Sequence, residues 1–168
     1  MERSTIRVQF IHGLESSPQG KKATVFARHF ETCTKAMNTR DFWGCVELQA
    51  DTINEFRPNV LVGSSFGGAV AVALLERGCW KGPTLLLAQA AFKYLPSACL
   101  PKGVPVLLVH GLKDDVIDIE DSRALARTGS NDMVKLIEVD DSHDLGGFVD
   151  SGRLVDLVRE AAQYSPAV

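Results

Sequence analysis

The chain has 168 residues, of which 45% are hydrophobic and 23% are charged, and its formal net charge is −3 at pH 7. This length and composition predict a single globular domain over residues 1–168, large enough to bury its own core. The small negative charge, with no basic run longer than Lys21-Lys22, argues against nucleic acid as a partner. Without an apolar run of the roughly 20 residues that a membrane span needs, we expect no membrane partner and a cytoplasmic location.

The four cysteines show no C-x-x-C spacing and lie far apart in the sequence, at Cys33, Cys45, Cys79 and Cys99. A disulfide framework is typical of shorter secreted chains. We therefore expect free, buried thiols.

The first half of the chain alternates strand and helix patterns. A strand is expected over residues 3–11, followed by a helix with Ser17 as N-cap and Pro18 as first helical position, ending near residue 31. A short second strand is expected over residues 34–38, and a weaker helical pattern covers residues 43–56. A third strand over residues 60–62 is followed by a helix over residues 69–76.

The second half continues the alternation. Strands are expected over residues 84–88, 104–109 and 134–139. One helix begins after the N-cap Asp118 and stops at Gly129, and a last helix spans residues 154–161. Continuous apolar strands separated by helices predict an α/β three-layer sandwich, with a mostly or wholly parallel sheet of about six strands. Functional side chains are expected at the carboxyl ends of those strands.

The most informative motif is the G-x-S-x-G pattern at residues 63–67, between the third strand and the helix that follows. A sharp strand-to-helix turn can hold a serine hydroxyl at its apex, and glycines two residues either side avoid a clash. Gly63 and Gly67 have that spacing around Ser65 and not around Ser64. Ser65 is therefore the candidate nucleophile. The alternative is a packing turn or anion-binding loop; no Lys-Ser/Thr follows, so nucleotide binding has no support.

A serine nucleophile needs a base, and the base needs a carboxylate to orient it. His143 lies in the loop after the last predicted strand, and Asp114 follows the fifth, with Asp115 as the alternative acid. His12 and His110 stand beside glycine at strand ends, where structural hydrogen bonding is expected. No histidine or cysteine spacing fits a metal site, and we expect neither a metal nor an organic cofactor.

Four motifs in this order resemble the α/β-hydrolases, specifically the short bacterial esterases that lack a lid domain. They are His12-Gly13-Leu14, the elbow at residues 63–67, H-G-x-x-D at residues 110–114, and Asp-Ser-His-Asp at residues 141–144. The resemblance implies acyl transfer, in which Ser65 attacks a carbonyl, His143 takes its proton and Asp114 stabilises the imidazolium. It also implies an oxyanion hole formed by the backbone N–H groups of Leu14 and Phe66.

The chain departs from the fuller pattern of this family in two respects. We expect the fold to lack the two strands that usually precede the strand of the oxyanion loop. Only about fifteen residues, 89–103, link the fourth and fifth expected strands. That link has no room for a lid, which favours a small soluble ester or thioester as the substrate and partner. We expect pocket walls from the Leu14 loop, residues 89–95, and the surroundings of Val116 and Leu145. The alternative function is a non-catalytic binding protein on the same scaffold.

Overall fold

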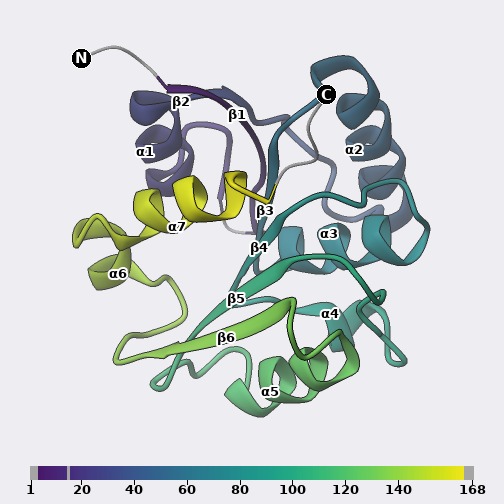
Figure 1. Cartoon of the computed structure of the whole chain (residues 1–168), viewed down its shortest axis with the longest axis vertical. Coiled ribbons are helices and arrows are strands. Elements are labelled where there is room, and N and C mark those ends of the chain that lie inside the picture. The colour runs from purple at the N-terminus through teal and green to yellow at the C-terminus, as the bar shows by residue number, and fades with distance from the viewer. Residues whose placement is uncertain (1–3, 15, 165–168) are drawn as a thin grey trace.

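The computed structural model describes residues 4–14 and 16–164, which form a wholly parallel six-stranded sheet between two layers of helices (Figure 1). The predicted α/β three-layer sandwich is confirmed. Residue 3, where the first strand was expected to begin, lies outside the described residues. The strands are β1 (Ser4–Ile11), β2 (Phe30–Cys33), β3 (Val60–Ser64), β4 (Thr84–Leu87), β5 (Val106–Gly111) and β6 (Val134–Val139). The helices are α1 (Lys21–His29), α2 (Phe42–Phe56), α3 (Phe66–Glu76), α4 (Ala91–Tyr94), α5 (Ile119–Thr128), α6 (Gly146–Asp150) and α7 (Arg153–Ala162).

The helices divide between the two faces of the sheet, and each face has its own buried cluster. Helices α1, α6 and α7 cover one face, while α2 to α5 cover the other (Figure 1). Alternate strand residues point to opposite faces, so Val62 packs beneath the first group of helices and its neighbour Leu61 beneath the second. Helix α3 crosses the centre of its face and is buried from Phe66 to Leu75, which explains its almost uninterrupted apolar sequence.

The strand order is β2-β1-β3-β4-β5-β6, so the chain reverses its direction of travel across the sheet after β2. The first crossover goes from β1 to β2, and every later strand is added on the other side of β1. Strands β1 and β3 are therefore neighbours whose following segments leave in opposite directions, with Ile11 paired to Gly63 near their ends. Ligand sites of open parallel sheets lie at such a switch point, beyond the carboxyl ends of the strands.

The second strand does not lie where the sequence predicted it. The segment 34–38 is not a strand; β2 instead runs from Phe30 to Cys33, directly after α1. Phe30 continues the helical spacing of Phe26, which extended the predicted helix too far, but its ring is buried as the first residue of β2. Asn38 belongs to a turn before α2, where its carbonyl oxygen accepts a hydrogen bond from the Asp41 N–H.

Two further local predictions need correction. Helix α1 begins at Lys21 with Gly20 as N-cap, because Ser17 forms a separate turn in which its Oγ accepts from the Gln19 N–H. Helices α4 and α6 are short helices that the apolar periodicity did not predict. The predicted ends of α5 are confirmed, since the Asp118 carboxylate accepts from the Glu120 N–H and Gly129 is the C-cap residue.

All four cysteines are free, as predicted, but they are not all buried. Cys45 is buried within the α2–α3 side of the core, whereas Cys79 and Cys99 are exposed. Cys79 follows the end of α3, and Cys99 lies in the loop before β5, where its N–H donates to the Glu76 carboxylate at the end of α3.

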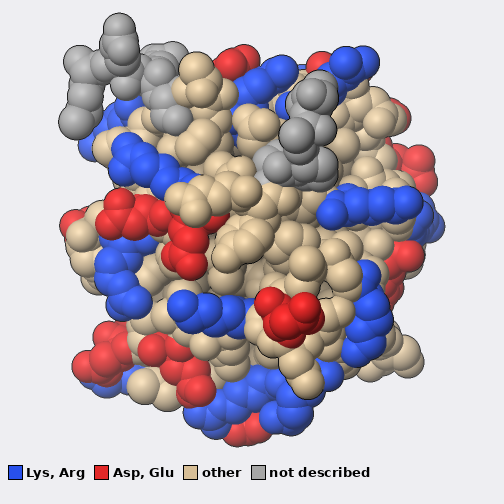
Figure 2. All heavy atoms as spheres, in the orientation of Figure 1, with Lys and Arg blue, Asp and Glu red and all other residues tan. Residues whose placement is uncertain are grey.

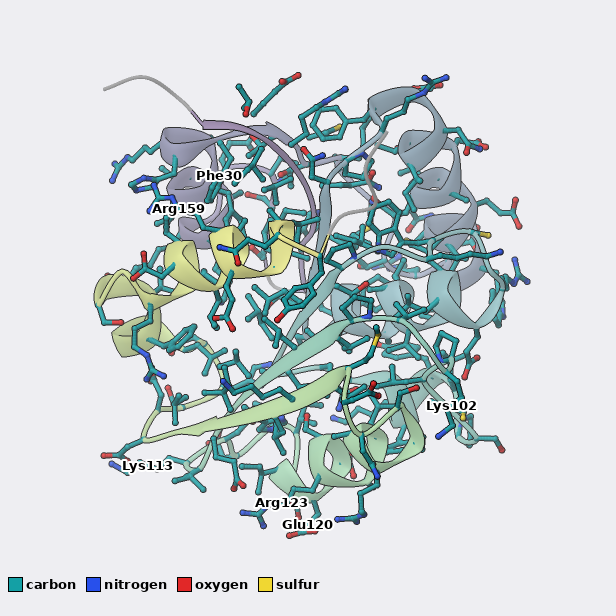
Figure 3. All side chains as sticks on the ribbon, in the orientation of Figure 1. Phe30, Lys102, Lys113, Glu120, Arg123 and Arg159 are labelled. Carbon is teal, nitrogen blue, oxygen red and sulfur yellow. The ribbon has the colours of Figure 1, made fainter. Side chains whose placement is uncertain are left out.

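Charged side chains of both signs are intermixed on the face drawn in Figure 2. Several tie elements together: Arg123 of α5 pairs with Glu120 of its own helix and with Glu138 of β6, near the lower edge of Figure 3. Arg159 of α7 stacks over the Phe30 ring, 5.8 Å from its centroid. Within residues 4–14 and 16–164, no helix combines the length and apolarity needed to cross a membrane.

Candidate active site

Ser65 forms the apex of the turn between β3 and α3, with backbone angles φ 54° and ψ −114°. A positive φ is uncommon for a residue with a Cβ atom and stores strain. Two hydrogen bonds fix this conformation from the neighbouring strand β4 and the loop after it. The Ser65 N–H donates to the Leu87 carbonyl at 2.9 Å, and the Ala90 N–H donates to the Ser65 carbonyl at 3.0 Å.

The glycines of the motif are needed because backbone segments meet at the elbow. A Cβ atom on Gly63 would overlap the carbonyl of Gly67, as the sequence predicted for a collision between strand and helix. A Cβ atom on Gly67 would overlap the Ile11 carbonyl at the end of β1. This second clash shows that β1, and not β3 alone, lies against the first turn of α3.

The three predicted triad residues lie together at the carboxyl edge of the sheet. His143 Nε2 is 3.0 Å from Ser65 Oγ, and His143 Nδ1 is 2.8 Å from Asp114 Oδ2. Because a carboxylate only accepts, Nδ1 carries the proton and Nε2 is free to accept from the serine hydroxyl. Ser65 follows β3, Asp114 follows β5 and His143 follows β6, so three separate strands position this hydrogen-bonded chain.

Asp114, and not Asp115, is the acid that meets His143. Its carboxylate is fully buried, and its Oδ1 accepts from the Val116 N–H at 2.9 Å and the Ile117 N–H at 2.8 Å. Asp115 points into solvent. Burial alone would raise the pKa of Asp114, but the hydrogen bonds from Ile117, His143 and Val116 outweigh burial and lower it. Asp114 is therefore held as a carboxylate.

A second histidine also touches Asp114. His110 is fully buried, and its Nε2 lies 2.9 Å from the Ile117 carbonyl and 3.2 Å from Asp114 Oδ2. Both partners accept, so Nε2 carries the proton. The other nitrogen, Nδ1, is 2.7 Å from Ser122 Oγ, which in turn accepts from Gln89 Nε2 at 3.0 Å. The expected structural role of His110 is thus a hydrogen-bonded link from the acid loop to α5.

His12 makes a simpler contact than His110. Its ring is buried, and its Nδ1 lies 2.8 Å from the Gly13 carbonyl, so Nδ1 donates there. This bond braces the start of the loop that carries Leu14. It agrees with the structural hydrogen bonding expected for His12.

The backbone N–H groups of Leu14 and Phe66 are both available beside Ser65. Within the part of the chain that the structure describes, neither has a hydrogen-bond partner. Gly13 lies against the elbow, since a Cβ atom there would be 3.4 Å from the Ser65 Cβ. Phe66 directly follows Ser65, and Leu14 lines the same cavity as Ser65, so both unpaired N–H groups are candidates for an oxyanion hole.

An aromatic cluster that the sequence did not single out packs behind the elbow. The rings of Phe42 and Tyr94 stack at 5.0 Å between centroids, and the Phe66 ring meets both edge to face, at 5.8 and 5.1 Å. These contacts join α2 and α4 to the first residue of α3. They fix the position of Phe66, whose N–H flanks Ser65.

A cavity of about 500 Å³ opens above Ser65 and His143. As predicted, Leu14 and Val116 contribute walls, both with exposed side chains. Residues 89–95 do not line it, because α4 packs against α3. Leu145 itself is buried in the core, but its neighbours Asp144 and Gly146 line the cavity, so the expected wall around Leu145 is present. Lys21 and Lys22 also line the cavity. The sequence did not predict this, because a helix starting at Pro18 places both lysines beyond its first turn. They form the longest basic run of the chain, shortly after Leu14.

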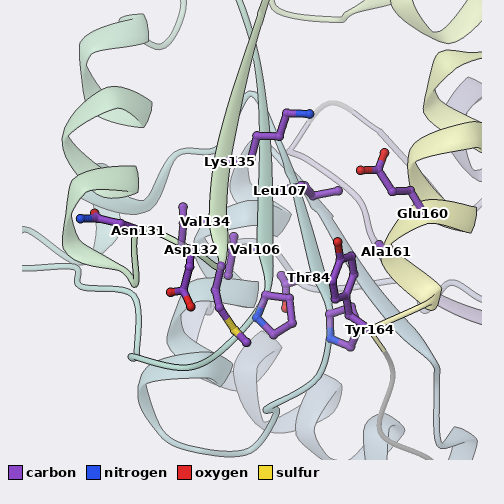
Figure 4. Close-up of a pocket in the computed structure, with 13 residues that line it drawn as sticks. Thr84, Val106, Leu107, Asn131, Asp132, Val134, Lys135, Glu160, Ala161 and Tyr164 are labelled. Carbon is purple, nitrogen blue, oxygen red and sulfur yellow. The ribbon is translucent and has the colours of Figure 1, made fainter.

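A second cavity, of about 350 Å³, lies at the opposite edge of the sheet (Figure 4). Thr84, Val106 and Val134, the first residues of β4, β5 and β6, line it together with Ala161 and Tyr164 of the C-terminal region. None of the predicted site residues contributes to it. It is therefore separate from the Ser65 site.

A parallel sheet with a serine elbow after β3, an acid after β5 and a histidine after β6 defines the α/β-hydrolase fold. No protein-family model and no curated protein sequence matches this chain. Solved structures do match it. Mouse alpha/beta hydrolase domain-containing protein 10 superposes with a TM-score of 0.78 at 16% identity, over 95% of this chain and 90% of that one.

Two microbial structures are also similar. A protein from Xanthomonas campestris pv. campestris, assigned to the alpha/beta superfamily of hydrolases, has a TM-score of 0.76 at 22% identity, over 92% of this chain and 97% of that one. A Paleococcus ferrophilus monoacylglycerol lipase has a TM-score of 0.75 at 14% identity, over 97% of each chain. The chain thus has the α/β-hydrolase fold over nearly its whole length.

Proposed function

We propose that this protein is a serine hydrolase that cleaves a small soluble ester or thioester through an acyl-enzyme intermediate. The hydrogen-bonded chain from Ser65 through His143 to Asp114, at the carboxyl edge of the sheet, is the observation that carries this proposal. The names of the similar structures, which include a hydrolase domain protein and a lipase, are consistent with it.

The first half of the reaction uses each group in the site. Ser65 Oγ attacks the substrate carbonyl carbon while its proton passes to His143 Nε2. Asp114, with its lowered pKa, stays ionised and stabilises the imidazolium that forms. The oxyanion accepts hydrogen bonds from the Leu14 and Phe66 N–H groups. The tetrahedral intermediate then collapses, and the leaving alcohol or thiol takes the proton from His143.

In the second half, water replaces the leaving group. His143 Nε2 removes a proton from this water, whose oxygen attacks the acyl carbon on Ser65. The new tetrahedral intermediate expels Ser65 Oγ, which regains its proton from His143, and the free acid departs.

The connection between β4 and β5 supports a small substrate. Residues 88–105 include one four-residue helix, α4, and Ala98 and Leu100 pack into the core. This segment does not extend over the cavity, so the serine is reached directly from solvent.

The test is Ser65→Ala, assayed with short 4-nitrophenyl esters and with a fluorophosphonate probe. Wild-type protein should turn over the esters and become labelled at Ser65, while the variant should lose labelling and about 10⁴- to 10⁶-fold in kcat. The alternative function, a non-catalytic binding protein on this scaffold, predicts an unlabelled wild type. Full turnover by Ser65→Ala would also overturn the proposal.

A further inference from the structure

The cavity above Ser65 has an uneven distribution of charge. Among residues 4–14 and 16–164, its charged lining residues are Lys21 and Lys22, from the first turn of α1, and Asp144, from the loop after His143. The Asp144 carboxylate is already engaged, because its Oδ1 accepts from Ser142 Oγ at 2.9 Å and from the Gly146 N–H at 3.0 Å. The two ammonium groups thus outnumber the one carboxylate.

The two lysines differ in how they are held. Lys21 Nζ forms an ion pair with Asp150 at 2.7 Å, and both side chains are more than half exposed. Lys22 is partly buried and makes one hydrogen bond, from Nζ to the Asp144 carbonyl oxygen at 2.8 Å. An ammonium has three N–H donors. Within the described residues Lys22 has no ion-pair partner, so two of its donors remain for a ligand.

Burial makes this ammonium a stronger site for an anion. It lowers the pKa of Lys22, because a buried ammonium loses hydration, while the Asp144 carboxylate opposes the shift. A partly desolvated cation gains more from an arriving carboxylate or phosphate oxygen than an exposed one does. The amino end of α1 adds to the effect, since its first turn contains no acidic residue and its N-cap Gly20 has no side chain.

The position of Lys22 indicates which part of an ester would meet it. In acyl transfer the carbonyl oxygen lies toward the Leu14 and Phe66 N–H groups, and the leaving oxygen lies toward His143 Nε2, which protonates it. Lys22 is bonded to the carbonyl of Asp144, the residue after His143. It therefore lies on the leaving-group side of the serine.

We propose that the preferred substrates are esters or thioesters whose leaving group carries an anionic substituent, a carboxylate or phosphate, which Lys22 binds. This specificity rests on the proposed hydrolase function and adds a substrate class to it. In this proposal Lys22 is the residue of the cavity that determines specificity for the leaving group.

The experiment compares two aryl acetates of nearly equal size, 4-carboxyphenyl acetate and its neutral amide, 4-carbamoylphenyl acetate. Each kcat/KM is divided by the rate of hydroxide-catalysed hydrolysis of the same ester, which removes differences in intrinsic reactivity. Wild-type protein should favour the carboxylate by about tenfold, the size expected of one charge-assisted hydrogen bond in a partly hydrated site.

Lys22→Gln should bring this ratio close to one. Glutamine keeps an N–H donor for the Asp144 carbonyl, so the site should stay intact. An unchanged kcat/KM for the neutral ester would show that it does. Lys102→Gln is the matched control. Lys102 is also an ammonium bonded to backbone carbonyls, those of Thr128 and Gly129 at 3.0 and 2.9 Å, but it lies outside the cavity and is labelled in Figure 3. This variant should retain the wild-type ratio.

Three results would overturn the inference: a wild-type ratio of one or less, an unchanged ratio in Lys22→Gln, or an equal loss in Lys102→Gln. A second pair of esters tests whether Lys22 faces the leaving group or the acyl group. If mono-4-nitrophenyl succinate, charged on its acyl side, were favoured over 4-nitrophenyl succinamate while the aryl acetates gave a ratio of one, the leaving-group placement would be wrong. Failure of the hydrolase proposal would look different, since no ester would be cleaved and Ser65 would not be labelled.

Discussion

His110 Nε2 lies 3.2 Å from Asp114 Oδ2, the same carboxylate oxygen that meets His143 Nδ1 at 2.8 Å. The acid of the candidate triad is thus held between two histidines, one facing the serine and one facing the core. His110 is in turn anchored to α5 through Ser122. The direction in which Asp114 presents its oxygen to His143 depends on this buried anchor.

His110→Ala should therefore reduce kcat by about tenfold, since a small misplacement of a catalytic group is costly, and should lower the free energy of unfolding by about 1–3 kcal/mol. The loss of stability follows because the Ser122 O–H would lose its acceptor and the Ile117 carbonyl its donor, although Ser122 Oγ would still accept from Gln89. Ser122→Ala is the control, because it keeps the His110–Asp114 contact; it should destabilise the fold with a smaller effect on kcat. Wild-type kcat in folded His110→Ala would contradict the anchoring role.

Asp114 and Asp115 are adjacent in sequence but should differ sharply in function. Asp114→Asn should lower kcat by about 10⁴-fold, because an asparagine can hold the imidazole in the wrong tautomer and cannot stabilise its charge. Asp115→Asn should change kcat little, since its side chain is exposed. Steady-state kinetics on one activated ester compares the two, and a similar loss in both variants would refute the assignment of Asp114.

The lowered pKa of Asp114 predicts a specific dependence of stability on pH. The native state releases this proton at lower pH than the unfolded state, whose Asp pKa is about 3.9, so the carboxylate stabilises the fold above about pH 4. That contribution is lost as pH falls from about 4 through the folded pKa. Urea unfolding of wild type and Asp114→Asn at a series of pH values should give a difference that shrinks in this acid range. A constant difference would contradict the shift.

Gly67 should be intolerant of any side chain. A Cβ atom would overlap the Ile11 carbonyl, which β1 cannot move without breaking its pairing with β3. Gly67→Ala should lower the free energy of unfolding by about 3 kcal/mol, a typical upper value for overpacking. Gly146→Ala is the control, because its new Cβ would have no neighbour closer than 3.5 Å. Equal thermal midpoints for the two variants would refute this packing argument.

The sequence predicted the site better than it predicted the cavity. The elbow residues, Asp114 and His143 could be identified because each follows a strand, and parallel strands bring their carboxyl ends to one edge. The role of Lys22 could not be predicted, since it depends on α1 starting three residues after Pro18. A turn made by Ser17 causes that delay, and serine is equally suited to a turn or an N-cap.

The errors in the predicted fold arise in a similar way, from residues that fit both a helix pattern and a strand pattern. Phe30 fits the apolar face of α1 and also the buried edge of the sheet, and tertiary packing decides between them. The contact of His110 with Asp114 could not be predicted from the sequence either. A spacing of four residues brings side chains together in a helix, whereas here a turn after β5 does so, and its path depends on hydrogen bonds to Asp114 itself.

The positive φ of Ser65 places this residue under opposing selective pressures. Glycine at this position would relieve the backbone strain and make the folded chain more stable, yet it would remove the hydroxyl. A screen for thermal stability alone would thus favour loss of the serine, whereas a screen for turnover would retain it. Directed evolution of this scaffold should therefore hold residue 65 fixed and seek stability on the far side of the sheet.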